Sequence, residues 1–178
     1  MYPSQGERTG FKQSAGNDIQ LSIIDTTRNN MLKQERFKLI ASVYALLIKD
    51  DRILLLRRFQ TGYEDGNYGL VAGHVDGRET MKEAMMREAR EEAGIDINDN
   101  DLELALTMHR WCGDHERIDL FFKVKEWIGI PKNMEPEKCD ELSWFPLDKL
   151  PNNTIHYIRT AIDCYLKDKS YCEFGWEK

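Results

Sequence analysis

The chain has 178 residues, of which 41% are hydrophobic, and its formal net charge is −6. These values are typical of one folded domain with a real core, and they argue against an intrinsically disordered chain. They also argue against broad nucleic-acid binding, which depends on clustered Lys and Arg side chains that neutralise phosphates. A small ligand suits this charge better than a polyanion does.

The cysteines and the chain start bear on the compartment. No Cys-x-x-Cys pair occurs, so the sequence predicts reduced thiols rather than a zinc site or a disulfide framework. No run of about eighteen apolar residues is present. The start, MYPSQGERTG, lacks the basic and apolar parts of a secretion signal. We expect a soluble, cytoplasmic protein that does not associate with membranes.

Residues 1–36 are rich in Gly, Ser, Gln, Asn and Asp, with a single short apolar run, Leu21–Ile24. This composition predicts a loosely held N-terminal arm, followed by a domain over residues 37–178. The alternative is a strand that pairs with a partner subunit. Monomer and homodimer are therefore both open.

The character of the chain changes at Lys38. Two apolar runs, LIASVYALLI and ILLLRRF, flank the turn-like stretch 49–52 and predict a β-hairpin. Such continuous apolar runs indicate central strands that are covered on both faces. Arg57 and Arg58 end the second run, where phosphates of a ligand could lie, although arginines at strand ends are usually solvated.

The stretch 59–67 is a loop containing Gly and Asp, and a helix is predicted a little further on. Thr80 followed by Glu83 forms a capping-box signature for the helix start. Gly94 is a suitable stop because glycine adopts positive φ readily. The spacing predicts a helix over residues 81–93.

This helix begins with an apolar stripe, and its spacing continues into acids. The stripe is Met81, Ala84 and Met85, and steps of three and four residues lead to Glu88, Glu91 and Glu92. Buried charges are usually paired or bound to metal, so these acids indicate a cation site. Oxygen ligands suit Mg²⁺, with Mn²⁺ as a substitute. A Mg²⁺ site in turn indicates phosphoryl transfer. The alternative is the solvated end of an amphipathic helix.

Beyond the helix, residues 102–109 and 117–127 read as two strands joined by a loop, which could form a wall of a pocket. In that loop Trp111 could stack on a base, and Glu116 could act as a base or an extra ligand, although both are also ordinary loop residues. Residues 140–145 predict a short strand. A final amphipathic helix is expected over residues 154–168, capped by Asn153, and its packed face is Ile155, Ile158, Ile162 and Leu166.

One motif is specific enough to name a family. Gly73, then five residues, Glu79, then seven residues and the stretch REAREEAGI at 87–95 resemble a complete Nudix box. The resemblance implies an α/β fold of the Nudix type, an α/β/α sandwich with a mixed β-sheet. It also implies hydrolysis of a phosphoanhydride in a nucleoside diphosphate linked to another group.

The resemblance also implies roles for box residues. The metal ligands would be the Gly73 carbonyl and the carboxylates of Glu88, Glu91 and Glu92. Glu91 or Glu92 would accept the proton of the attacking water, with Glu116, Asp140 or Glu141 as alternatives outside the box. Glu79 and Arg87 would support the box, with Arg87 orienting a glutamate.

The box motif says less about the substrate than about the reaction. Tentative substrate contacts are Arg57, Tyr68, His74, Glu116, Asp140 and Glu141, of which Asp140 and Glu141 could accept hydrogen bonds from a base. Tyr68 stands near where the family commonly has Trp, which leaves substrate details open. A (deoxy)nucleoside triphosphate is the first substrate class, followed by ADP-ribose or another nucleotide sugar and then the 5′ end of RNA. The alternatives to a hydrolase are a non-catalytic nucleotide sensor and an isomerase on the same fold.

Overall fold

The computed structural model describes residues 36–176. The chain divides into two units, Met1–Phe37 and Lys38–Lys178, and the second contains every element described. Apart from Arg36, the predicted N-terminal arm and its apolar run Leu21–Ile24 lie outside the described residues. Within residues 36–176, no helix is long and apolar enough to cross a membrane.

Eight strands, two α-helices and one 3₁₀ turn make up the described part. In chain order they are β1 (Ile40–Lys49), β2 (Arg52–Arg58), β3 (Tyr68–Gly69), β4 (Ala72–His74), α2 (Met81–Ala93), η1 (Asp99–Asp101), β5 (Leu102–Trp111), β6 (Glu116–Val124), β7 (Cys139–Pro146), α3 (His156–Leu166) and β8 (Tyr171–Phe174).

Strand β1 is the centre of the sheet because it pairs with three other strands. It runs parallel to β6, antiparallel to β4, and antiparallel to β2 only beside the turn, where Ile48 faces Ile53. The turn residues Asp50 and Asp51 both have positive φ, as a tight hairpin turn requires. Strand β2 then pairs with β3 and β7, and β5 lies between β6 and β8. The predicted hairpin and the mixed sheet are confirmed.

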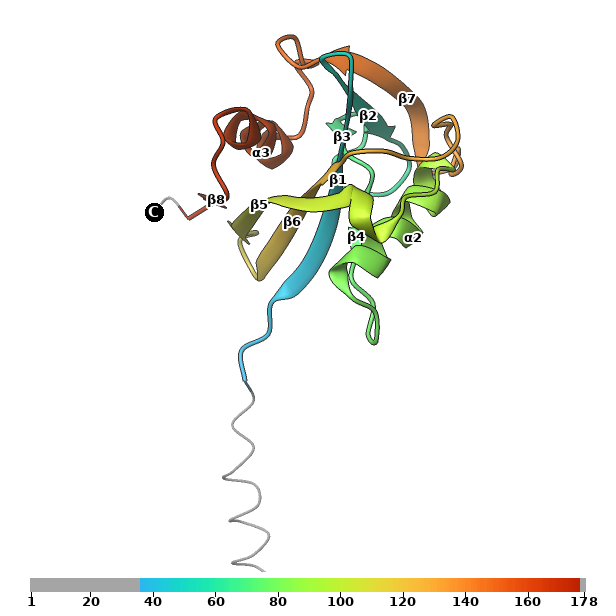
Figure 1. The fold of residues 1–178 in the computed structure, drawn as a ribbon. Helices are drawn as coiled ribbons and strands as arrows, with labels where there is room; N and C mark the ends of the chain where they lie inside the picture. Colours follow the sequence, from blue (N-terminus) through green and yellow to red (C-terminus); the bar gives the residue numbers. More distant parts are fainter. Residues whose placement is uncertain (1–35, 177–178) are drawn as a thin grey trace, which may run out of the picture. The chain divides into compact units, whose positions relative to one another are not determined.

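The sheet separates two hydrophobic cores. Side chains of successive strand residues point to opposite faces, so Leu54 and Leu56 pack under α2 whereas Ile53 and Leu55 pack under α3. Figure 1 shows the two helices on opposite sides of the sheet. The predicted α/β/α sandwich is therefore the observed architecture.

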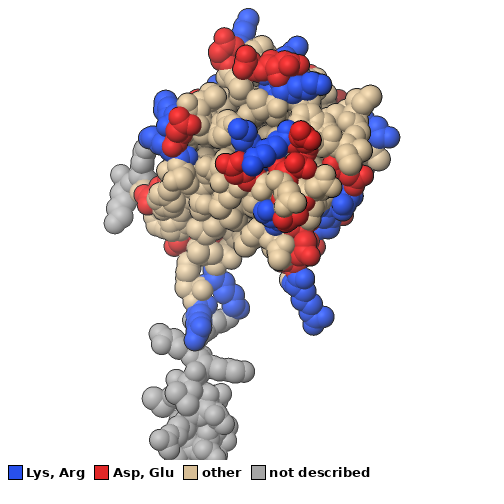
Figure 2. All heavy atoms as spheres, viewed as in Figure 1, with Lys and Arg blue, Asp and Glu red and all other residues tan. Residues whose placement is uncertain are grey.

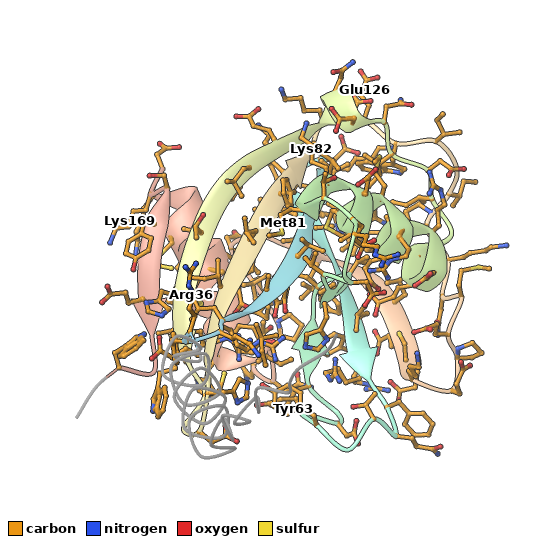
Figure 3. The ribbon with its side chains drawn as sticks, turned by 90° about the horizontal axis from the view of Figure 1, so that it is seen from below. Arg36, Tyr63, Met81, Lys82, Glu126 and Lys169 are labelled. Atoms are coloured by element: carbon orange, nitrogen blue, oxygen red, sulfur yellow. The ribbon has the colours of Figure 1, made fainter. Side chains whose placement is uncertain are left out.

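Helix α2 begins and ends as its signals predict. The Thr80 hydroxyl accepts from the Glu83 amide, the Glu83 carboxylate accepts from the Thr80 amide, and Gly94 is left-handed with φ 64°. The predicted apolar stripe is wrong at its first residue, because Met81 is 38% exposed at the helix start (Figure 3). The buried face consists of Ala84, Met85, Ala89 and Ala93.

Several predicted boundaries need correction. Helix α3 begins two residues later than expected, at His156, and ends at Leu166, which is 49% exposed rather than packed. Asn153 does not cap it, because its side-chain amide donates to the Gly66 carbonyl in a neighbouring loop. Strand β6 ends at Val124, short of Trp127. Strand β8 was not predicted, because a four-residue strand with alternating burial carries little signal.

Candidate active site

A cleft of about 390 Å³ lies between α2, β4 and the end of β2. We call it the carboxylate cleft, because acids form much of its lining. Its charged lining residues are Arg58, Asp76, Arg87, Glu88, Glu91, Glu92, Glu135 and Lys138, and its backbone edge is Ala72 to His74. The cleft brings together the box glutamates of α2 and the strand that carries Gly73.

The backbone of Gly73 fits closely against the carboxylate of Glu88. A Cβ built on Gly73 would lie 1.8 Å from Glu88 Oε1, which no side chain could accommodate. Gly73 itself is fixed by its antiparallel pairing with Val43 in the sheet. Glycine at this position therefore lets a helix carboxylate approach the strand backbone.

Arg87 organises the acids on one side of the cleft. Its guanidinium donates to Glu79 at 2.8 Å and to Glu88 at 2.6 Å, and it reaches Glu91 at 3.2 Å. It also donates to the His74 carbonyl, which joins α2 to β4. The hydrogen bonds to Arg87 lower the pKa of Glu79. Such planar donor forks hold carboxylates in fixed orientations.

Glu92 is held from the opposite side of the cleft. Its carboxylate accepts from the Ala72 amide at 2.8 Å. Burial raises the pKa of Glu92 to about 8, and the negative charge of Glu88 adds to this. Burial likewise raises the pKa of Glu88, although Arg87 opposes the effect. Two carboxyl groups in one cleft thus disfavour a second negative charge unless a cation is present.

The oxygen atoms that line the carboxylate cleft are chemically suited to bind a hard divalent cation. Carboxylate and carbonyl oxygens are the ligands that Mg²⁺ and Mn²⁺ prefer. Within residues 36–176, however, no group of three or more Asp, Glu, His or Cys side chains is gathered closely enough to hold a metal ion. In this arrangement Arg87 pairs with both Glu88 and Glu91, and the Glu91 side chain is 53% exposed.

A second region, which we call the basic pocket, adjoins the carboxylate cleft. It is formed by Arg58, His74, Arg110 and Arg117 around hollows of about 230 and 710 Å³. Arg58 and His74 line both regions. Burial and the nearby Arg117 lower the pKa of His74, which favours its neutral ring beside the Arg117 guanidinium at 2.8 Å.

Sequence reasoning missed most of this pocket. Arg110 is buried on the same strand face as Met108, and it pairs at 2.5 Å with Asp119, which has no exposed surface. A charged residue in register with buried strand positions is the signal that could have identified the pair.

Four of the predicted substrate contacts lie together elsewhere. Arg57 donates to Asp140 at 2.7 Å and contacts Glu141 at 3.6 Å, and the Tyr68 hydroxyl donates to Glu141 at 2.6 Å. None of the four lines the carboxylate cleft or the basic pocket. Arg58 reaches the cleft instead of Arg57, because adjacent strand residues face opposite sides.

The remaining predicted contacts lie in different parts of the structure. His74 lies in the cleft and the pocket, as described above. Glu116 sits on β6 and pairs with His109 Nε2 at 2.8 Å, outside both lining sets. Trp111 lines the basic pocket from β5.

Charged groups are mixed on the face drawn in Figure 2. Lys and Arg side chains there alternate with Asp and Glu side chains rather than forming one continuous basic surface. The basic pocket is thus a local feature of a chain whose net charge is −6.

Comparison with known proteins identifies related chains. The model of the NUDIX domain matches residues 38–162. NAD-capped RNA hydrolase NudC of Stutzerimonas stutzeri is 30% identical over 114 residues, which cover 64% of this chain and 39% of that protein. The protein of the same name from Pseudomonas aeruginosa is 27% identical over 135 residues, covering 75% of this chain and 46% of that protein. The chain thus spans less than half the length of these relatives.

Solved structures show the same fold. The MutT NUDIX hydrolase of Burkholderia pseudomallei matches with a TM-score of 0.65 and 29% identity, over 71% of this chain and 97% of that chain. The MutT protein of Methanosarcina mazei Go1 matches with a TM-score of 0.64 and 25% identity, over 75% and 96%. Because the family model covers strands β1 to β7, helix α2 and the complete box, the chain belongs to the Nudix hydrolase family, as its box predicts.

Proposed function

We propose that this protein hydrolyses a phosphoanhydride bond in a nucleoside diphosphate linked to another group, with Mg²⁺ as cofactor and Mn²⁺ as a substitute. The observation that carries the proposal is the pair of carboxylates, Glu88 and Glu92, held in one cleft against the backbone of Ala72 and Gly73. We retain Glu91 and the Gly73 carbonyl as the further proposed ligands.

The proposed chemistry divides the work among the residues of the cleft. When bound, the metal ion would supply charge stabilisation at the phosphate oxygens and a lower pKa for the attacking water. Arg87 orients Glu88, and the Ala72 amide orients Glu92. Glu91 and Glu92 are the proposed acceptors of the water proton. Arg58 lies where it could neutralise a phosphate that enters the cleft.

The substrate proposal has two candidates. A (deoxy)nucleoside triphosphate remains the first, because a metal site and a few arginines suffice to bind its phosphates. The second is a dinucleotide or a capped RNA 5′ end, which the names of the NudC relatives favour. The hollow of about 710 Å³ beside the cleft suits either candidate, because both carry a nucleoside in addition to their phosphates.

A substrate panel tests both parts of the proposal. Nucleoside triphosphates, ADP-ribose, NAD and capped RNA would be incubated with the protein and Mg²⁺, and products would be identified by mass. The proposed function requires turnover of at least one of them that stops when the metal is chelated. Turnover that continues unchanged in excess chelator, or no turnover of any phosphoanhydride, would contradict it.

A further inference from the structure

The turn between α3 and β8 brings two cysteines together. Cys164 lies near the end of α3, and Cys172 lies on β8. All four cysteines of the chain are free thiols in this structure. We propose that Cys164 and Cys172 form a redox-sensitive pair, which a low-molecular-weight disulfide oxidises to an intramolecular disulfide. This inference goes beyond the proposed function, and its test requires no turnover.

Both cysteine side chains belong to the core between α3 and the sheet. Cys164 is 9% exposed and is a member of this core, and Cys172 packs against it. Cys172 pairs in register with Met108 of β5, which is fully buried in the same core. Because paired residues of neighbouring strands point to the same face of a sheet, the Cys172 thiol faces α3 rather than the side of α2.

An aromatic contact fixes how α3 lies along β8. The rings of Tyr157 and Phe174 meet edge to face, with 6.2 Å between their centres. Cys164 follows Tyr157 by two helical turns and therefore shares its helix face, and Cys172 precedes Phe174 by two strand residues and shares its strand face. Since the chain reverses between the two elements, the ring contact at one end places the cysteines opposite each other at the other end.

Hydrogen bonds close the turn that joins the two elements. The Cys164 carbonyl accepts from the amides of Lys167 and Lys169, at 3.1 and 3.0 Å. Asp168 between them has a positive φ of 53°, which reverses the chain direction. Lys169 (Figure 3) is followed by a single residue before β8 begins. The backbone of Cys164 is therefore held close to the start of the strand that carries Cys172.

The apolar setting of the pair makes its oxidation slow. Burial raises the pKa of the Cys172 thiol to about 12, and the neighbouring Cys164 thiol adds to this rise. The thiolate is the form that attacks a disulfide, so a thiol with a raised pKa exchanges slowly near neutral pH. Oxidation of this pair is therefore a response to sustained oxidising conditions rather than to a brief exposure.

The oxidation proceeds by two thiol–disulfide exchanges. One cysteine loses its proton and attacks a sulfur of the small disulfide, whose S–S bond breaks and whose other half leaves as a thiolate and takes up a proton. The second cysteine then loses its proton and attacks the cysteine sulfur of this mixed disulfide, which releases the remaining half as a thiol. The two cysteines together lose two electrons and two protons, and the small disulfide is reduced to two thiols.

The crosslink joins the two elements that form one wall of the basic pocket. Tyr157 of α3 and Phe174 of β8 both line its larger hollow. Strand β8 is the last strand of the sheet and pairs with β5. A bond to α3 therefore restrains a strand at the edge of the sheet, and with it the position of Phe174.

Peptide mapping of the oxidised protein tests the proposal. The full-length protein is incubated with oxidised glutathione at mildly alkaline pH, the remaining thiols are alkylated, and tryptic peptides are identified by mass. Lys167 and Lys169 lie between the two cysteines, so trypsin places them in separate peptides, 160–167 and 170–178. We expect these peptides to be joined, and to separate on reduction with dithiothreitol. Glutathione on Cys172 without the crosslink would overturn the proposal.

The same reaction in concentrated guanidinium chloride shows whether the fold brings the thiols together. In the folded protein the Cys164–Cys172 crosslink should predominate over pairings that involve Cys112 or Cys139. Unfolding should reduce this preference, because only the short separation in the sequence then favours the pair. A preference that is equal in the folded and the unfolded protein would overturn the proposal, as would a folded protein that mainly forms another pair.

Variants link the crosslink to a measurable effect on stability. Oxidation should raise the Tm of the wild type by about 5 °C, as expected for a disulfide that fits the folded state. Cys172→Ala should abolish both the crosslink and the rise, and Cys164→Ala provides the same test if that variant does not fold. The control is Cys112→Ala, which changes another partly buried cysteine and should retain both. A crosslinked wild type that melts no higher than the reduced protein would overturn the proposal.

Discussion

The carboxylate cleft and the basic pocket lie side by side and share Arg58 and His74, but they differ in the balance of acidic and basic side chains. In the cleft, Arg87 alone bridges Glu79, Glu88 and Glu91, so acids exceed cations. In the pocket Arg110 and Arg117 share the buried carboxylate of Asp119, and Glu64 and Glu92 also line the hollows, so acids and cations are closer to balance. The difference shows that the local balance of charge varies between neighbouring regions of a chain whose net charge is −6.

The largest effect is expected for Glu92→Gln, which tests the carboxylate cleft. Loss of a proposed metal ligand should lower kcat by about 10²- to 10⁴-fold, since each 1.4 kcal/mol of lost transition-state stabilisation is about tenfold. The melting temperature should stay close to that of the wild type. Steady-state kinetics with the best substrate of the panel measures the effect.

The matched control is Glu126→Gln, which changes an exposed glutamate after β6 (Figure 3). It should leave kcat unchanged. A folded Glu92→Gln protein with wild-type turnover would remove the metal assignment from this residue.

Gly73→Ala tests the contact between strand and helix. The added methyl group would occupy the position of the Glu88 carboxylate, 1.8 Å from Oε1, so Glu88 must move away from β4. We expect activity to fall by at least about tenfold and unfolding free energy to fall by about 1–3 kcal/mol, as in other overpacked sites. Denaturant unfolding and kinetics measure the two effects. The control is Gly77→Ala, where a Cβ meets nothing within 4 Å.

Mg²⁺ should stabilise the folded protein, because it relieves the excess of acids and binds the folded state only. At one hundred times its Kd the gain is about 2.7 kcal/mol, or roughly 5–10 °C in Tm for a chain of this size. Thermal melts across a Mg²⁺ titration measure it, and Glu88→Gln should reduce the shift. A melting curve that does not respond to Mg²⁺, with or without nucleotide, would count against the carboxylate cleft as a metal site.

The smallest effect is expected at Asp140. Its carboxylate is paired with Arg57, which lowers its pKa, and both groups are solvent-exposed. Exposed ion pairs contribute little to stability. Asp140→Ala should therefore leave kcat/KM and the ranking of bases close to wild type. If Asp140→Ala instead flattens the preference among bases and leaves metal dependence intact, Asp140 contacts the substrate. The substrate site would then extend beyond the carboxylate cleft and the basic pocket.

The successful predictions rest on signals between residues that are close in the sequence. The capping box at Thr80 and the glycine stop at Gly94 define α2 because both act within a few residues. The box motif identified the family for the same reason. These features depend on neighbours in the chain and need no knowledge of the sheet.

The predictions that failed depended on pairing across the sheet. Whether Arg57 or Arg58 enters the cleft is decided by the register of β2 with β7, which places Arg57 opposite Glu141. The basic pocket was missed because Arg110 and Asp119 meet only when β5 and β6 pair. The hydrogen bonds of the box glutamates could not be read from the spacing either, because Arg87 joins Glu88 to Glu91 whereas the Ala72 amide holds Glu92.

The central place of β1 has a consequence for how the chain folds. Its turn with β2 closes locally, whereas its parallel pairing with β6 joins residues such as Ser42 and Asp119, far apart in the sequence. Loop-closure entropy must be overcome before such pairs form, and folding rates fall as contacts become less local. We expect the formation of the β1–β6 pairing, rather than of either helix, to limit the refolding rate. A substitution on that seam should slow refolding, whereas one in the exposed part of α2 should mainly speed unfolding.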